Sequence, residues 1–385
     1  MVNFLSEKDS KLDKKEIEFA EKPQRFRWID QGRGFIVFLL VLTLAFPPDV
    51  WKPKGSLMFF LFGHPGSFDT YMTIYDIGAA AFIFVIGLIF SISFRKRLER
   101  NGLKSAIFHV VVRYGLLLIL GFLIIFAGGD VIRYSNQLPG VPILVWDVIP
   151  TLGLVGFVTL PFVFIKKYEI RMIVGYIWII LYQILMITTP LKLYAQLSVH
   201  GGIFGSIFGY SGIMIISTAL GDYMFYAGTK DKIKYKNMAM FAVINFIAGI
   251  LISFVPGWEA SKRQVSFTHC IISIGVSVFG LLLFVYFDKV KKMELNFFQA
   301  FGRNPFLIYF IGVTPVLILE QTIGVDLGLG WPGNLLITCI ILTYTTVTAL
   351  YLYKNKKIIS TEKATIIFLI VVIILAILLL SLGVI

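Results

Sequence analysis

The chain has 385 residues, of which 57% are hydrophobic and only 15% charged, and its formal net charge is +13. Soluble globular chains carry about 25% charged residues, so this composition excludes an ordinary soluble domain. The positive charge does not indicate a nucleic-acid-binding protein, because the basic residues are spread over many short loops rather than gathered in one domain.

The amino-terminal segment is charged and contains no apolar stretch of the kind found in a signal peptide. We interpret residues 1–24 as a solvated cytoplasmic tail. Residues 25–385 show no strong internal repeat and no long linker, so they are expected to form one membrane domain.

After the tail, apolar blocks of roughly 18 to 24 residues alternate with short polar clusters, and such a block can cross the ~30 Å hydrocarbon layer as a helix. The pattern predicts an all-α, polytopic bundle of about eleven transmembrane helices. The predicted spans are 28–46, 76–94, 105–127, 146–165, 172–189, 203–227, 238–255, 266–287, 297–319, 333–353 and 364–384.

The basic residues fall on alternate loops of this topology. The tail and every second loop hold 26 of the 35 Lys and Arg residues, whereas the other loops hold six. Lys and Arg are favoured in cytoplasmic loops. The pattern therefore predicts an integral, multi-pass protein of a bacterial cytoplasmic membrane, with its amino terminus in the cytoplasm.

The segment RFRWIDQGRG, at the cytoplasmic end of the first span, contains Arg25, Arg27, Asp30 and Arg33. The planar guanidinium group of Arg donates two parallel hydrogen bonds and suits phosphate. The alternative interpretation is structural. In that case the arginines anchor the span at the membrane surface, and Asp30 pairs with Arg33 one helical turn away.

Two polar residues flank the predicted outer loop between the first two spans. His64 lies in that loop and is either a general base or an ordinary surface side chain. Asp76 opens the second span, where a carboxylate either caps the helix or orients a histidine.

Two later segments place polar groups at the ends of spans. EASKRQVSFTHC puts Lys262, Ser266 and His269 at the outer end of the eighth span, as a binding group or as a solvated loop leading into a helix cap. FGRNPFLIYF puts Arg303 and Asn304 at the cytoplasmic end of the ninth span. The following proline predicts a kink or a helix start there, and Arg303 can also extend to the membrane surface.

The sequence contains no phosphate-binding loop, zinc-protease motif or serine-hydrolase motif. Its two cysteines do not have the spacing of a metal site, so we expect no metal cofactor.

In order and spacing, these segments resemble the heparan-α-glucosaminide N-acetyltransferase family, membrane acyltransferases related to the bacterial acyltransferase type 3 proteins. That family opens with R-x-R-S-x-D-x-x-R-G, which Arg25, Arg27, Asp30, Arg33 and Gly34 match. It continues with a histidine in the first outer loop and a segment like LTxxDLVFPxFxFxxG, which MTIYDIGAAAFIFVIG resembles.

Two further segments carry the resemblance to about residue 320. The lysine of the family's P-x-N-K-x-x-W-T-x-S corresponds to Lys262, and Ser266 lies near its hydroxyl residues. The family's G-M-N-x-L-x-x-Y is similar to the segment with Gly302, Asn304 and Tyr309. Several family positions are replaced in this chain, so the resemblance is that of a divergent member.

The resemblance implies an acyl-group transfer across the membrane. Acetyl-CoA or another acyl-CoA would be the donor on the cytoplasmic side, and the acceptor would be a glycan or lipid-linked sugar reached from the outer side. His64 would be the catalytic base or transient acyl carrier, and Asp76 would orient it. The donor site would comprise Arg25, Arg27, Asp30, Arg33, Arg303 and Asn304, and the acceptor site Lys262, Ser266 and His269.

Two other functions remain open from the sequence. The same bundle would serve a transporter or flippase, with polar groups facing a central path, or a non-catalytic membrane protein that binds or assembles with others. Membrane lipid is an expected partner in every case, and homo-oligomer formation is left open.

Overall fold

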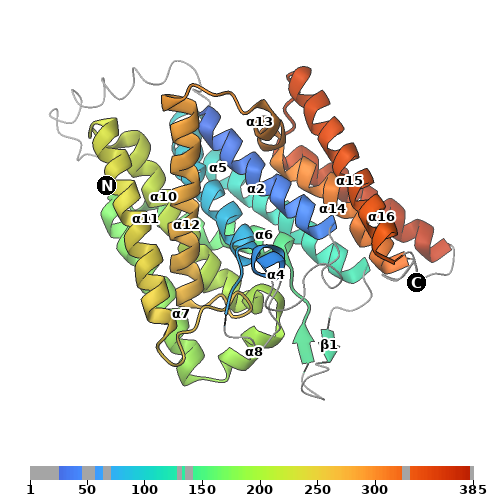
Figure 1. Cartoon of the computed structure of the whole chain (residues 1–385), viewed down its shortest axis with the longest axis horizontal. Coiled ribbons are helices and arrows are strands. Elements are labelled where there is room, and N and C mark those ends of the chain that lie inside the picture. The colour runs from blue at the N-terminus through green and yellow to red at the C-terminus, as the bar shows by residue number, and fades with distance from the viewer. Residues whose placement is uncertain are drawn as a thin grey trace.

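The computed structural model describes residues 26–45, 57–63, 71–127, 132–134, 142–322 and 330–381. In these ranges the chain is predominantly helical, and the helices pack side by side in one bundle (Figure 1). Strands β1 (Ile132–Tyr134) and β2 (Pro142–Leu144) form a short antiparallel pair, which the sequence analysis did not predict. The helical membrane class is confirmed, with this strand pair as an addition.

Each predicted apolar block contains a helix. The long helices are α2 (Arg27–Ala45), α5 (Gly78–Ala127), α7 (Tyr168–Thr188), α10 (Ser211–Tyr226), α11 (Asp231–Ser253), α12 (Phe267–Val285), α14 (Pro305–Thr322), α15 (Gly330–Lys354) and α16 (Thr361–Ser381). The shorter elements are α4 (Leu57–Phe62), η2 (Tyr75–Ile77), α6 (Val148–Thr159), η3 (Leu160–Phe164), α8 (Leu191–Leu197), η4 (Val199–Gly201), α9 (Gly202–Phe204), η5 (Gly205–Tyr210), η6 (Tyr286–Val290) and α13 (Asn296–Arg303).

Six helical stretches of the described chain are long and apolar enough to cross a membrane. They are Tyr75–Ile125, Tyr168–Thr188, Gly202–Tyr226, Asp231–Ser253, Phe267–Val290 and Leu335–Lys354. These stretches indicate a membrane protein with several spans. The count of eleven spans and the cytoplasmic amino terminus remain predictions.

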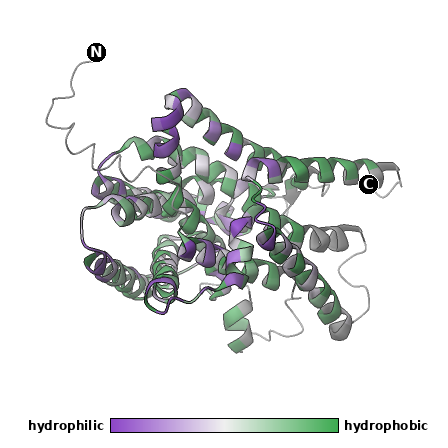
Figure 2. Ribbon diagram, turned by 90° about the horizontal axis from the view of Figure 1, so that it is seen from above, coloured by the Kyte–Doolittle hydropathy of each residue, from purple (hydrophilic) through white to green (hydrophobic). Residues whose placement is uncertain are grey.

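The outward faces of the helices are apolar, which is the reverse of a soluble bundle. On α7, the side chains of Ile173, Ile177, Leu181 and Ile184 recur every three or four residues, and each is between 41% and 58% exposed. Hydrophobic residues cover most of the helices in Figure 2. A soluble monomer rarely exposes a continuous apolar surface of this extent, so these faces suit contact with lipid.

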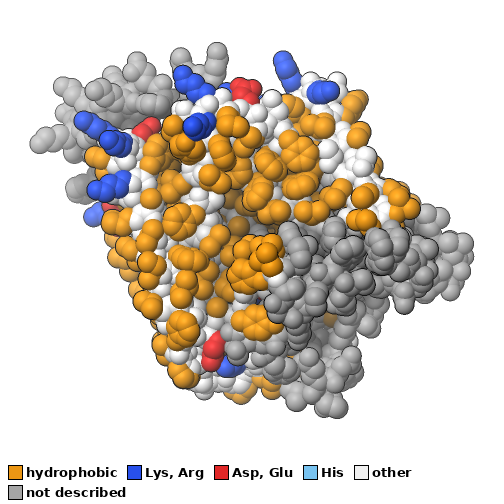
Figure 3. All heavy atoms as spheres, in the orientation of Figure 1, with side chains coloured by type: hydrophobic (Ala, Val, Ile, Leu, Met, Phe, Trp, Pro, Cys, Tyr) orange, Lys and Arg blue, Asp and Glu red, His pale blue; other side chains and the backbone are white. Residues whose placement is uncertain are grey.

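Charge is distributed unevenly along the bundle. In Figure 3, Lys and Arg side chains gather at the upper end of the visible face, and the flank below them is mainly hydrophobic. Figure 1, in the same orientation, places α13 and the start of α2 at that end. Basic side chains are therefore concentrated at one end of this face, while the side of the membrane on which that end lies remains a prediction.

One helix joins two predicted spans, and one predicted span forms two helices. Helix α5 covers the second and third predicted spans, and its break lies at Gly102, where a φ of 78° and ψ of 171° favour glycine. The ninth block forms two helices, α13 and α14, which meet at Asn304. Pro305 begins α14, as predicted for a residue that has no backbone N–H to donate.

Candidate functional site

Asp76 is completely buried in η2, the short turn that leads into α5. Its carboxylate accepts a hydrogen bond from the backbone N–H of Thr73 at 2.8 Å. The same carboxylate lies 3.8 Å from the ammonium group of Lys262. A buried carboxylate requires partners of this kind, because an isolated charge in apolar surroundings is costly. Asp76 is therefore the centre of a buried polar group, which we call the Asp76 cluster: Asp76, Lys262, Ser266, His269 and Tyr210.

Lys262 comes to this cluster from the loop between α11 and α12. Only 17% of its side chain is exposed, and its ammonium nitrogen lies 5.7 Å from the centre of the Tyr75 ring. Burial lowers the pKa of Lys262 to about 8, although the nearby Asp76 carboxylate acts in the opposite direction. The amine therefore changes its charge near pH 8, well below the ordinary range of a lysine.

The lowered pKa of Lys262 can be measured by competitive acetic anhydride labelling across a pH series, with mass spectrometry of the peptide. We expect a labelling midpoint near pH 8. Asp76→Asn should move the midpoint lower, because the carboxylate is the group that favours the charged amine. A midpoint equal to that of an unstructured lysine peptide would contradict the burial of this amine.

The loop before α12 is held by Ser266, which is the N-cap of that helix. Its hydroxyl accepts hydrogen bonds from the N–H groups of Ser261 at 3.0 Å and His269 at 3.3 Å, and donates to the Glu259 carbonyl at 2.8 Å. These bonds fix the turn that carries Lys262. The predicted role of Ser266 in substrate binding stays a prediction, while the contacts shown are those of a helix cap.

His269 lies in the first turn of α12 and is completely buried. Its Nε2 is 3.2 Å from the backbone carbonyl oxygen of Asp76. A carbonyl only accepts, so Nε2 must carry the proton of this bond. In a neutral ring Nδ1 then has a lone pair, and it has no hydrogen-bond partner within the described part of the chain. His269 is thus oriented by the Asp76 carbonyl, and the lone pair of its neutral ring lies on the buried Nδ1 atom.

Two residues that the sequence analysis did not single out extend the cluster. The ring of Tyr210 packs edge-on against His269, with centroids 6.3 Å apart. The hydroxyl of Tyr210 lies 3.0 Å from Nδ1 of His200. Both side chains are buried, and His200 has a positive φ of 54°. Their sequence neighbours are mainly small or apolar, so no motif identified them.

The predicted catalytic residue His64 and the predicted donor-site residue Arg25 lie outside the described residues. Gly63, the residue that precedes His64, is described, and its carbonyl oxygen accepts a hydrogen bond from the hydroxyl of Thr73 at 2.7 Å. Thr73 also donates its N–H to Asp76. The segment that leads into His64 is therefore joined to the Asp76 cluster through Thr73.

The predicted donor-site residues at the start of α2 have partners within the protein. Arg27 pairs with the carboxylates of Glu294 and Asp288. Arg33 donates to Asp30 Oδ1 at 2.5 Å and to the carbonyl oxygen of Gly302 through both Nε and a terminal nitrogen. The Asp30–Arg33 pair of the structural interpretation is therefore present, and it also holds the end of α13.

The segments RFRWIDQGRG and FGRNPFLIYF meet where α2 packs against α13. A Cβ atom on Gly302 would lie 1.7 Å from the carbonyl oxygen of Asp30, so the helices approach closely only because this residue is glycine. Asn304 donates to the carbonyl of Lys357 at 3.0 Å and accepts from the N–H of Ile359 at 2.7 Å. The guanidinium group of Arg303 lies 4.2 Å from the centre of the Tyr353 ring. The donor-site role of these residues stays a prediction.

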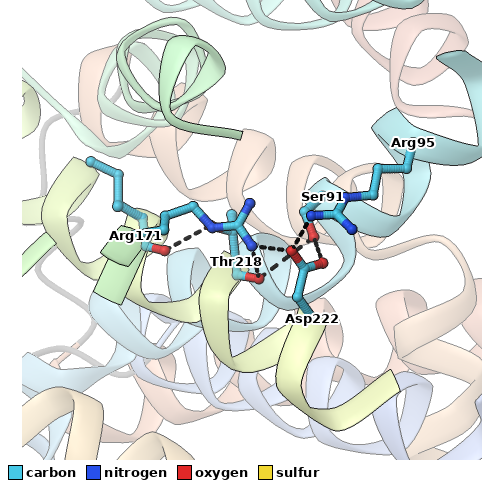
Figure 4. A network of polar contacts seen from close by, with 6 residues as sticks. Ser91, Arg95, Arg171, Thr218 and Asp222 are labelled. Carbon is cyan, nitrogen blue, oxygen red and sulfur yellow. Dashed lines mark hydrogen bonds and ion pairs between the residues drawn. The ribbon is translucent and has the colours of Figure 1, made fainter. Parts of the chain in front are cut away.

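A second buried charged network connects α5, α7 and α10 (Figure 4). The carboxylate of Asp222 contacts Arg171, accepts from Arg95 at 2.7 Å and accepts from the hydroxyl of Ser91 at 2.5 Å. Arg171 is completely buried, and its Nε and one terminal nitrogen have no partner among the described residues. Thr218 adds its carbonyl oxygen 3.3 Å from Arg171.

This network is not predictable from the loop pattern, because Arg95 and Arg171 lie between predicted spans, where basic residues are expected in loops. One signal was present: Asp222 is an ionisable residue inside a predicted span, and such a residue usually has a partner.

The described residues contain no group of three or more His, Cys, Asp or Glu that could hold a metal ion. No protein-family model matches the chain, and no curated protein matches it. The resemblance to the membrane acyltransferases therefore rests on the sequence motifs alone.

Proposed function

We propose that the protein is an integral-membrane acyltransferase that moves an acyl group from acyl-CoA to a hydroxyl or amine of an envelope sugar. The observation that carries the proposal is the meeting of Asp76, Lys262 and His269 at one buried point inside an apolar bundle. Buried ionisable groups of this kind are costly and tend to mark functional sites.

The Asp76 cluster contains the groups that acyl transfer requires. A base takes the proton of the acceptor while the acceptor oxygen or nitrogen bonds to the thioester carbonyl carbon. The carbon–sulfur bond then breaks, and the thiol leaves with a proton. In the proposal, His64 or the Nδ1 atom of His269 is the base. The ammonium group of Lys262 stabilises the oxyanion, and Asp76 favours the charged form of that lysine.

Acyl-CoA enters the proposal as the donor substrate through the resemblance. The described residues that could bind its phosphates already have partners within the protein. Arg27 and Arg33 pair with carboxylates, and Arg33 also donates to a backbone carbonyl. The side-chain amide of Asn304 donates to one backbone carbonyl and accepts from one backbone N–H. Binding of phosphate at this end would exchange those pairs for phosphate contacts.

The test uses native membranes that carry the full chain, with labelled acetyl-CoA, and follows both thiol release and label incorporated into envelope glycans and lipids. Lys262→Met, and the double variant His64→Ala with His269→Gln, should each reduce label transfer by at least ~100-fold, because the first removes the proposed oxyanion stabiliser and the second removes both candidate bases. Lys192→Met is the matched control, since Lys192 lies in α8 and is not part of the Asp76 cluster.

Label transfer equal to that of membranes without the protein would overturn the proposal. So would unchanged transfer by both variants. Transport by the same bundle would instead appear as substrate movement into sealed vesicles without thiol release.

A further inference from the structure

The loop that carries Lys262 ends in a tight turn just before α12, at the lower end of that helix in Figure 1. The N–H of Ser266 donates to the carbonyl of Ser261 at 3.1 Å, and the N–H of Val265 donates to the carbonyl of Lys262 at 3.1 Å. This nested pair of bonds is that of a Schellman motif, in which the next-to-last residue has a left-handed backbone. That residue is Val265, and its φ is 55°.

Valine is an unusual residue for this conformation. Glycine normally occupies it, because a positive φ crowds a Cβ atom against the backbone, and a β-branched side chain is the least tolerant. Val265 is also completely buried. Backbone strain of this kind persists only where the surrounding structure imposes it, and it is concentrated at functional sites. The contacts around Val265 therefore have to hold it in place.

Three glycines at intervals of four residues receive the side chain of Val265, and we call them the glycine groove: Gly201, Gly205 and Gly209. A Cβ atom on Gly209 would lie 2.5 Å from Cγ1 of Val265, closer than real contacts allow, and one on Gly205 would lie 3.1 Å from Cγ2. A Cβ atom on Gly201 would lie 3.1 Å from the carbonyl oxygen of Gln264. The valine fits only because these residues have no side chain.

Helix α7 holds the same turn through two polar side chains. The hydroxyl of Tyr182 donates to the carbonyl of Gln264 at 2.9 Å. The side-chain oxygen of Gln183 accepts from the N–H of Phe267 at 2.8 Å. These two bonds flank Val265, so the strained residue is fixed between α7 and the glycine groove.

We infer that Val265 is a positioning residue, whose left-handed backbone and seat in the glycine groove direct Lys262 toward the Asp76 carboxylate 3.8 Å away. Lys262 belongs to the same six-residue turn and shares a backbone hydrogen bond with Val265, so a displaced valine moves the lysine with it. The inference rests on the proposed function for its consequence that acyl transfer depends on Val265. The position of the lysine can be measured without any reaction.

The strain at Val265 is tested by comparing Val265→Gly with Val265→Ala in thermal unfolding of the full chain in bicelles. Alanine is more stable than glycine where φ is negative, and the order reverses where φ is positive. Val265→Gly should therefore unfold at the higher temperature, by on the order of 1 °C or more. Val278 is the matched control, because it is completely buried within α12, where the alanine variant should be the more stable.

The positioning role is tested by Gly209→Ala, which places a methyl group against Cγ1 of Val265. The turn must then shift, and the acetic anhydride labelling midpoint of Lys262 should rise by about one pH unit or more toward that of an ordinary lysine. Burial is the largest influence that lowers this pKa, so a displaced and better hydrated amine has a higher one.

The double variant Gly209→Ala with Val265→Ala should restore the midpoint to near pH 8, because the valine methyl groups are removed where the new methyl group is added. Gly280→Ala is the control and should leave the midpoint unchanged. Gly280 also lies in a helix, and a Cβ atom there would meet no atom within 4 Å in the described structure.

An unchanged midpoint in Gly209→Ala would overturn the inference, and so would a raised midpoint that the double variant does not restore. Greater stability of Val265→Ala than of Val265→Gly would also overturn it, and this comparison stands even if Gly209→Ala does not fold. Thiol release from the same membranes keeps the two proposals apart. Midpoints that move as expected without thiol release in the wild type would support the positioning role and refute acyl transfer. Thiol release with unmoved midpoints would refute the positioning role alone.

Discussion

Asp222→Ala should lower the free energy of unfolding by about 3–5 kcal/mol, the range measured when one partner of a buried ion pair is removed. The variant leaves the completely buried Arg171 without its carboxylate, and Arg95 and Ser91 lose the same partner. The measurement is equilibrium unfolding of the purified protein in bicelles, with thermal unfolding as a second readout.

The matched control is Arg27→Ala, which removes the ion pairs of a 41% exposed arginine with Glu294 and Asp288. Solvent screens such a pair, so its loss should cost about 0–1 kcal/mol. The double variant Asp222→Ala with Arg171→Met should recover part of the loss, because the completely buried guanidinium group is then removed as well, and only Arg95, which is 28% exposed, is left without that carboxylate. If Asp222→Ala costs no more than Arg27→Ala, the network does not hold α5, α7 and α10 together.

His269→Gln should reduce acyl transfer by roughly 10²–10⁴-fold, the usual contribution of a positioned general base. A glutamine amide can still donate to the Asp76 carbonyl, but it offers no basic nitrogen in place of Nδ1. The thermal unfolding midpoint should therefore change little.

His109→Gln is the control, because His109 lies on α5 beside Glu362 and is not a member of the Asp76 cluster. It should retain transfer activity. Full activity in His269→Gln would remove His269 as the base and leave that role to His64. A large fall in the unfolding midpoint of His269→Gln would instead show that His269 mainly supports the fold.

The helical segments could be predicted because each depends on local composition. Blocks of apolar residues between charged clusters are sufficient to identify helices that are suited to lipid. The break at Asn304 and Pro305 was also predictable, since proline favours the first position of a helix. The paired strands β1 and β2 were not, because their short segments carry no strong alternation of apolar and polar residues.

The candidate site could be predicted only in part. Asp76, Lys262 and His269 were singled out as polar residues at the ends of spans, and the structure brings them together. Their mutual contacts depend on packing between segments far apart in sequence, which no local pattern encodes. For the same reason Arg171 was counted as a loop residue, although it is completely buried against a carboxylate from another helix.

A cavity of about 210 Å³ between α2, the start of α5 and α12 is lined by Phe35 and Ile74, which are 36% and 47% exposed, and such an opening on the flank of the bundle would have a consequence for kinetics. A substrate that enters there searches for the protein by diffusion in two dimensions. Its effective concentration is its mole fraction in the bilayer, so adding inert phospholipid at constant total substrate should slow the reaction by surface dilution. The Michaelis constant for such an acceptor would then be expressed as a mole fraction, whereas that for the soluble donor would remain a molar concentration.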